Sequence, residues 1–266
     1  MSGIGGVIGA RVVPSYKAAS GVWRPSDIAR LRSAVAVANG DVWPIAADPY
    51  YSSTTGLWQF TSCVSGAYPD TSSVGSNSAT VGTGFLDNTQ AKWSRYSMRG
   101  KPSQLLAKAT AATAAGFNFG TGDFTIEGWV YVVAADMGGN QVILDMRLAS
   151  EPSIRPLIYF TSTGVLNFYL NGGARITSAS GVITGSAWQH WHVSRISGST
   201  QMGVDGAQVG STYTDGNTYT QGNALFGLDY PASAGFSGWF GPHRITKGVG
   251  RYSGSYTVPT GPFPDY

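Results

Sequence analysis

The sequence predicts an all-β protein: a two-sheet antiparallel jelly-roll sandwich with an N-terminal extended arm and a short helix. The first observation is an alternation of apolar and polar residues along Asp123–Val133, in which Phe124 and Ile126 share one face and Thr125 and Glu127 the other. A period of two is typical of a strand that buries one face and exposes the other to water. We therefore expect the face with Thr125 and Glu127 to be solvated.

Turn signals between strand patterns are the second observation. Asn171-Gly172 and Asp205-Gly206 are dipeptides preferred at two-residue hairpin turns. The strands predicted from Asp123 onward span residues 123–133, 141–147, 155–162, 165–171, 174–178, 187–196, 199–204, 207–212, 223–228 and 236–246. Many short strands at this spacing favour a sandwich or a jelly roll.

Composition agrees with this class. The chain has 266 residues, of which 12% are charged and 12% aromatic, so it can build a large core as one β domain with an arm. Its net charge of +3 is spread thinly, and we expect no nucleic-acid binding. The first ten residues lack the basic region of a signal peptide, and no apolar run approaches membrane-spanning length, so we expect no membrane insertion.

Residues 1–48 differ from the rest and are predicted to form the arm. Residues 26–40 are predicted to form its short helix, with Pro25 and Ser26 at the start and Asn39-Gly40 at the end. The apolar helix face and the flanking tryptophans have no core of their own: Trp23, Ile28, Leu31, Val35 and Trp43. Such side chains need a partner surface, so we expect the arm to anchor the chain or to mediate oligomerisation.

The sandwich is predicted to span residues 49–266. We expect its first strand at Leu57–Val64, then a loop over residues 65–83 with at most one edge strand, and a weak strand around Gln104–Ala109. Cys63 is the one cysteine, which excludes an internal disulfide. We expect Cys63 to be a small buried side chain of the first strand.

Several spaced motifs resemble laminin-G-like, concanavalin A-like lectin/glucanase domains. The motifs are Asn118–Val130 (NFGTGDFTIEGWV), Trp188–Arg195 (WQHWHVSR) and Met202–Gly210 (MGVDGAQVG). Arg244–Tyr252 and Pro262–Tyr266 are similar to the version of this domain in structural proteins of tailed bacteriophages. The resemblance covers residues from about 50 to the C-terminus and implies a two-sheet jelly-roll sandwich.

The resemblance implies a non-enzymatic surface protein of a bacteriophage virion, either a head decoration protein or a tail-associated fibre or adhesin. Such a protein is made in the host cytoplasm and binds other virion proteins, here as a homo-oligomer anchored by its arm. Two alternatives remain open. One is a lectin that binds a host surface glycan during attachment, and the other is a polysaccharide hydrolase.

Residues suited to catalysis are sparse. Retaining glycosidases need two carboxyl groups about 5 Å apart, whereas Glu127 and Glu151 are the two glutamates and Asp145 stands alone. His190 and His192 lie on one strand face without a third metal ligand at useful spacing. We therefore expect no catalytic residues and structural roles for both histidines.

Loop residues are the candidates for ligand contact. Laminin-G-like domains often hold calcium through loop aspartates, but turn aspartates more commonly bond their own backbone. We therefore expect no cofactor, with calcium as the weaker alternative; the aspartates concerned are Asp123, Asp205, Asp215 and Asp229. The residues predicted to contact a glycan or a protein lie near the C-terminal hairpins: Tyr213, Asn217, Tyr219, Tyr230 and Trp239.

Overall fold

The computed structural model describes residues 47–74, 77–81, 85–100, 107–109, 116–147, 154–220, 222–230 and 233–266, with the backbone alone for residues 81 and 107–109. Ala47–Tyr266 is a compact unit. Residues 1–46 of the predicted arm lie outside the described residues, and with them Trp23, Ile28, Leu31, Val35 and Trp43.

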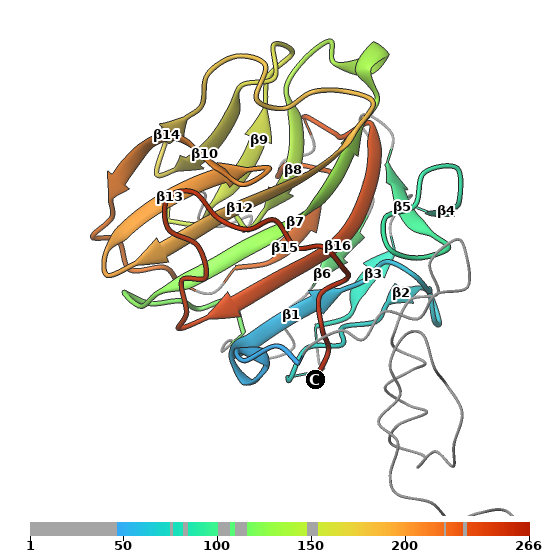
Figure 1. The fold of residues 1–266 in the computed structure, drawn as a ribbon, viewed down its shortest axis with the longest axis horizontal. Helices are drawn as coiled ribbons and strands as arrows, with labels where there is room; N and C mark the ends of the chain where they lie inside the picture. Colours follow the sequence, from blue (N-terminus) through green and yellow to red (C-terminus); the bar gives the residue numbers. More distant parts are fainter. Residues whose placement is uncertain are drawn as a thin grey trace, which may run out of the picture. The chain divides into compact units, whose positions relative to one another are not determined.

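Two antiparallel sheets form the compact unit, which confirms the predicted all-β sandwich (Figure 1). The strand order of the first sheet is β14 (Ala207–Thr214), β13 (Ser199–Val204), β12 (Trp188–Ile196), β7 (Phe124–Val132), β16 (Gly238–Lys247), β5 (Ser97–Gly100) and β4 (Phe85–Asp87), and β1 (Thr54–Trp58) also pairs with β16. The order of the second sheet is β11 (Gly173–Thr177), β10 (Leu166–Leu170), β9 (Leu157–Phe160), β8 (Gln141–Asp145), β15 (Ala224–Phe226), β6 (Ala107–Ala109), β3 (Ala79–Val81) and β2 (Ala67–Tyr68).

Helical structure within the described ranges is limited to two 3-10 turns, η1 (Tyr51–Ser53) and η2 (Ala134–Asp136). No helix in this part of the chain is long and apolar enough to cross a membrane.

Both predicted hairpin turns are present. Asn171 and Gly172 have φ angles of 52° and 77°, and Asp205 and Gly206 have φ angles of 46° and 92°. Positive φ at both central residues matches the twist of the flanking strands, and Asn, Asp and Gly accept it most readily. The turns join β10 to β11 and β13 to β14, and they set the register of both hairpins.

The space between the two sheets holds the main apolar core. From the first sheet, Phe124 and Ile126 of β7 point into it, and from the second sheet Ile158 and Phe168 meet them. One irregularity interrupts the first sheet: the pairing of β16 with β7 shifts between Phe240 and His243, at Gly241-Pro242. Proline is tolerated at such a bulge because a ladder hydrogen bond is already missing there.

The first strand and its cysteine differ from the prediction. β1 begins and ends earlier than the predicted Leu57–Val64. It ends early because Phe60 has a φ of 53°, which interrupts the extended backbone. Cys63 is therefore exposed in a loop, and the expectation of a buried cysteine was wrong. The short strands β2, β3, β4 and β5 occupy or follow the segment expected to be a loop.

The solvated face predicted for β7 is buried at Thr125 and Glu127, which are both 0% exposed. Residues 248–266, the C-terminal strap, cross this outer face of the first sheet in dark red (Figure 1). The Thr125 hydroxyl donates to the Val249 carbonyl over 3.0 Å, and the Tyr256 amide donates to the Gly206 carbonyl over 2.9 Å. Alternation identified the two faces correctly, but it carries no information about the segment that covers the outer one.

Candidate functional site

The outer face of the first sheet is divided along its strands into two halves. The half that contains Glu127 lies under the strap and is called the strapped half. The half that contains Tyr131, four residues further along β7, is called the open half. Because residues four apart on a strand point to the same side, both belong to one surface.

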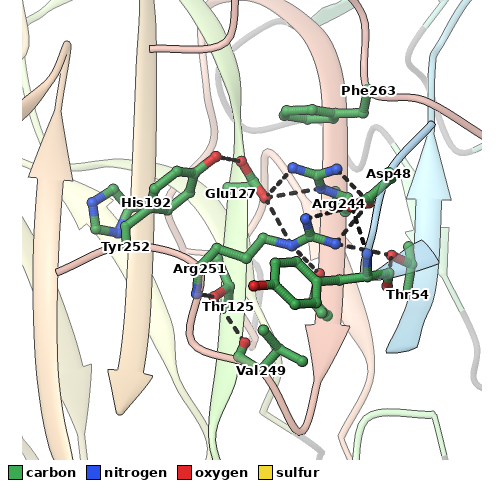
Figure 2. A network of polar contacts seen from close by, with 12 residues as sticks. Asp48, Thr54, Thr125, Glu127, His192, Arg244, Val249, Arg251, Tyr252 and Phe263 are labelled. Carbon is green, nitrogen blue, oxygen red and sulfur yellow. Dashed lines mark hydrogen bonds and ion pairs between the residues drawn. The ribbon is translucent and has the colours of Figure 1, made fainter. Parts of the chain in front are cut away.

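A network of ion pairs and hydrogen bonds between buried charged side chains occupies the strapped half (Figure 2). The Glu127 Oε1 atom accepts hydrogen bonds from Arg244 Nε at 2.9 Å and Arg244 Nη2 at 2.7 Å, and its Oε2 atom accepts one from the Tyr252 hydroxyl at 2.6 Å. Asp48 Oδ2 lies 2.8 Å from Arg244 Nη1 and 2.7 Å from Arg251 Nη2. Two carboxylates and two guanidinium groups therefore balance each other in the interior.

Glu127 is unsuited to catalysis in this network. Burial opposes its ionisation, but the charge of Arg244 and the hydrogen bond from His190 outweigh burial and hold the pKa of Glu127 well below its ordinary value. A general acid must carry a proton near the working pH. Asp145 lies in the second sheet and is bonded to Arg147 at 2.9 Å and 2.7 Å, so the two acids form no pair across a substrate.

Both histidines of β12 pack into the strapped half. His190 Nε2 lies 3.3 Å from Glu127 Oε2, and its Nδ1 lies 2.9 Å from the Tyr256 hydroxyl. Since a carboxylate only accepts, Nε2 carries the hydrogen that faces Glu127. The His192 ring centroid lies 4.6 Å from those of Tyr252 and Tyr256, and burial lowers the pKa of His192 to about 3. These contacts match the structural roles predicted for the two residues.

A row of side chains crosses five strands in the open half. Trp188 pairs with Tyr131, Tyr131 with Trp239, Trp239 with Arg99, and Arg99 with Phe85. Directly opposed residues of neighbouring strands point to the same face. Because strands lie about 4.8 Å apart, this aromatic row is roughly 19 Å long.

The aromatic row is ordered by ring contacts and is partly open to solvent. The ring centroids of Trp188 and Tyr131 lie 5.8 Å apart and those of Tyr131 and Trp239 5.4 Å apart, both edge to face. The Arg99 guanidinium lies 4.1 Å from the centre of the Trp239 ring. Phe85, at the end of the row, is 45% exposed. Edge-to-face contacts fix ring orientation, so the row presents a preformed apolar strip.

A lysine and two further tryptophans adjoin the row. Lys92 Nζ lies 3.9 Å from the centre of the Trp129 ring and 4.3 Å from that of Trp93. At Gly241, a Cβ atom would lie 3.0 Å from Trp129 Cβ, 3.1 Å from Lys92 Cβ and 3.2 Å from the Trp188 ring. Glycine therefore permits this close packing, and Lys92 lies beside the Trp188 end of the row.

The contact residues predicted from the sequence do not form one surface. Tyr213, Asn217 and Tyr219 gather around the buried Asp215, where Asn217 Nδ2 donates to Asp215 Oδ1 at 2.7 Å and to the Tyr213 hydroxyl at 3.0 Å. Tyr219 is 1% exposed and donates to Asp215 Oδ2 at 2.6 Å, so it supports the loop from inside. Tyr230 is 41% exposed after β15. Of these candidates, Trp239 alone belongs to the aromatic row.

The aspartates considered for calcium bond protein groups. Asp123 Oδ1 accepts from the Ser197 amide at 2.8 Å, and Asp229 Oδ1 accepts from the Ser233 amide at 2.6 Å. Among the residues that the structure describes, no group of three or more His, Cys, Asp or Glu side chains is placed to hold a metal ion.

Sequence reasoning missed the aromatic row as a unit. Its members Tyr131, Trp188 and Trp239 stand at outward positions of three strands that are far apart in the chain. An aromatic residue at the same outward register of several strands is the available signal, but it needs the strand order and register first. Arg99 and Phe85 lie on strands that were not predicted.

A family model places this architecture among known proteins. It is described as the concanavalin A-like lectin/glucanases superfamily and matches residues 106–248, which is more than half of the 266-residue chain. The chain belongs to this superfamily. No curated protein matches it.

Solved structures share the sandwich. Trypanosoma rangeli sialidase is similar with a TM-score of 0.55 and 13% identity over 84% of this chain and 35% of that chain. A mutant of it that displays trans-sialidase activity has a TM-score of 0.53 and 14% identity over 77% of this chain and 32% of that one. The chain thus spans about a third of the sialidases' length.

Domain 4 of AbnA, a GH43 extracellular arabinanase from Geobacillus stearothermophilus, is also similar in its complex with arabinotriose. The TM-score is 0.50 with 13% identity, over 73% of this chain and 92% of that domain. At these identities the comparisons show the superfamily fold and not a shared activity.

Proposed function

We propose that this chain is a non-enzymatic surface protein of a bacteriophage virion and that its sandwich binds carbohydrate through the aromatic row. The row carries the binding part of the proposal. Sugar rings present apolar C–H faces and hydroxyl edges, so an aromatic strip packs against the faces while neighbouring polar groups bond the edges. Trp188 and Tyr131 supply the strip, and Arg99 and Asp87 supply polar groups beside it.

The state of the acids supports binding without hydrolysis. Asp87, next to the row, already accepts hydrogen bonds from Trp239 Nε1 at 3.1 Å and from the Thr89 amide at 2.7 Å. Glu127 lies sealed under the strap and paired with Arg244. Glycoside hydrolysis by paired acids needs one carboxyl group that donates a proton and a second one that acts as nucleophile or base.

The virion part of the proposal rests on the resemblance of Arg244–Tyr252 and Pro262–Tyr266 to phage structural proteins. In this proposal residues 1–48 anchor a homo-oligomer to other capsid or tail proteins, and the sandwich faces outward to a host surface glycan. The similar arabinanase domain holds arabinotriose, so the fold is compatible with saccharide binding.

The binding part is tested with the full chain and a panel of bacterial polysaccharides in affinity electrophoresis. We expect the chain to bind at least one polymer and Tyr131→Ala to weaken binding about tenfold or more, a loss of about 1.4 kcal/mol. Tyr159→Ala, on the second sheet, is the matched control and should bind normally. Equal binding by wild type and Tyr131→Ala would overturn the site, and release of reducing sugar would overturn the non-enzymatic assignment.

The virion part is tested by immunogold electron microscopy of particles from cells that make the chain. Antibodies against the sandwich should label the particle surface. Deletion of residues 1–45 should abolish the label while the soluble sandwich remains folded. Unlabelled particles, or full labelling after the deletion, would contradict the anchoring proposal.

A further inference from the structure

The geometry points to an acidic saccharide as the ligand of the aromatic row, recognised through its carboxylate or sulfate groups by Lys92 and Arg99. This inference rests on the proposed carbohydrate binding and specifies the chemical class of the ligand. Two cations carry it: Lys92, which lies near the Trp188 end of the row, and Arg99, which belongs to the row.

Lys92 is a half-buried cation without a direct counter-ion. Its ammonium group lies over the rings of Trp129 and Trp93 and makes no ion pair within the described ranges. Burial lowers the pKa of Lys92, and the negative charge of Asp205 opposes this change. Asp205 is already engaged elsewhere, because its Oδ1 atom accepts a hydrogen bond from the His190 amide at 2.8 Å. An anion that approaches Lys92 would therefore gain attraction in a partly desolvated place, where it is stronger than in water.

Within the described part of the chain, the guanidinium group of Arg99 likewise lacks a close counter-ion. Its side chain is 29% exposed, and the distance from its Nη1 atom to Asp87 Oδ2 is 4.0 Å, too long for a direct hydrogen bond. Its buried Nε atom has no hydrogen-bond partner. Asp87 instead accepts from Trp239 and Thr89. A planar guanidinium with unused donors matches a carboxylate or sulfate group.

The two cations lie at different places along the row. Lys92 and the Trp188 ring both lie close to Gly241, and Arg99 is the register partner of Trp239. Three strand spacings separate Trp188 from Arg99, which is roughly 14 Å. A saccharide that packs on Tyr131 would thus meet a cation in either direction, which suits a polymer with repeated acidic groups.

Hydrogen-bonding capacity agrees with the charge. The groups without a partner in this region are Arg99 Nε and the indole Nε1 atoms of Trp93 and Trp129, and all three are donors. The indole groups lie beneath the surface, where they add to the positive potential. Because these donors are buried, they do not bond a ligand directly, but the positive potential that they add favours an anion over a neutral sugar.

The test compares acidic polymers with their own carboxyl-reduced forms. Polygalacturonate, hyaluronan and polysialic acid are each measured against the reduced form by calorimetry with the full chain at low salt. We expect at least one acidic polymer to bind about tenfold tighter than its reduced form, with the difference shrinking as sodium chloride is added. Equal affinities for every pair, or no binding of any acidic polymer, would overturn the inference.

Variants of Lys92 and Arg99 test whether these two cations cause the preference for the acidic polymer. Lys92→Met keeps the aliphatic stem on the tryptophan rings and removes the charge. In the double variant with Arg99→Met, the acidic polymer and its carboxyl-reduced form should bind with nearly equal affinity, so their ratio should be near one. Lys92→Arg should preserve this ratio. Lys247→Met, at the far end of β16, removes one positive charge away from the row and is the control, which should also preserve the ratio. An unchanged ratio in the double variant overturns the acidic ligand. If Tyr131→Ala abolishes binding at the same time, carbohydrate binding at the row still stands.

Discussion

The strapped half and the open half are built on the same strands but differ in chemistry and burial. Along β7 the polar Glu127 is buried, whereas the aromatic Tyr131 is partly exposed. Along β16 the charged Arg244 and the aromatic Trp239 differ in chemistry alone, because they are 5% and 6% exposed. Charges are tolerated under the strap because each has an opposite partner at hydrogen-bond distance. The aromatic row has no such charge pairing: Trp188 and Tyr131 are half-buried on one side of the buried Trp239, and Phe85 is 45% exposed at the far end. Large apolar side chains left exposed to water are typical of a binding surface.

The largest loss of stability is expected in the strapped half, on substitution of Glu127. Among the residues that the structure describes, Glu127→Ala leaves Arg244 and Arg251 with Asp48 as their one acidic partner, so the free energy of unfolding should fall by about 3–5 kcal/mol. Urea denaturation measures it. Tyr131→Ala on the same strand is the control, with an expected loss of about 1.5 kcal/mol or less. A loss of under about 1 kcal/mol for Glu127→Ala would mean that the network does not hold the strap.

Acidic pH should weaken the molecule through the same buried groups. Burial lowers the pKa of His192 and His243 to about 3 from 6.5, so between these values the unfolded chain binds more protons and stability falls as pH falls. The pKa of Glu127 is held below 4.5, so its stabilisation is complete above that pH and is lost as pH falls further. Tm should therefore drop steadily from about pH 7 to about pH 4. A flat Tm over this range would contradict the assignment of neutral buried histidines, and His243→Phe should flatten it in part.

A smaller effect is expected at Tyr252. Tyr252→Phe removes the hydroxyl that donates to Glu127 over 2.6 Å and leaves the ring in place, so it should cost about 2 kcal/mol. Hydrogen exchange should show faster opening of residues 248–256 with the sheet unaffected. Uniformly faster exchange in both sheets would show that the strap and the sandwich unfold as one unit.

The smallest effect is expected at the end of the aromatic row. Phe85→Thr replaces an exposed ring on edge strand β4, and we expect the free energy of unfolding to stay within about 0.5 kcal/mol. Thermal denaturation checks this. A clear loss of stability would mean that the open half supports the fold and is no separate binding surface.

Long alternation and hairpin turns made most of the second half of the chain predictable. β13 was predicted at its observed bounds, 199–204, and β7 within one residue at each end, 124–132 against 123–133. Strands of three or four residues, such as β4 and β5, contain too little alternation to be recognised. The end of β1 was also not predictable, because the positive φ of Phe60 interrupts a segment whose composition is typical of a strand.

The candidate site was less predictable than the fold, because it depends on contacts between distant segments. Glu127 meets Arg251 and Tyr252 of the strap, and a strand pattern does not show which segment covers it. The aromatic row requires the register of β7 against β12 and β16, which comes from the assembled sheet. Tyr219 shows the reverse error: a tyrosine in a polar loop was predicted to be a contact, yet it is buried on Asp215.

The bulge at Gly241-Pro242 decides which side chains the two halves receive. Trp239 and Arg244 are an odd number of residues apart, so in an uninterrupted strand they would point to opposite sides. The register shift between Phe240 and His243 reverses the phase, and both residues face outward while Phe240 and Ile245 face the core. Deleting Gly241 would restore the plain repeat and turn either the tryptophan or the arginine inward. One strand thus contributes both to the aromatic row and to the charge network under the strap, because its repeat is broken once.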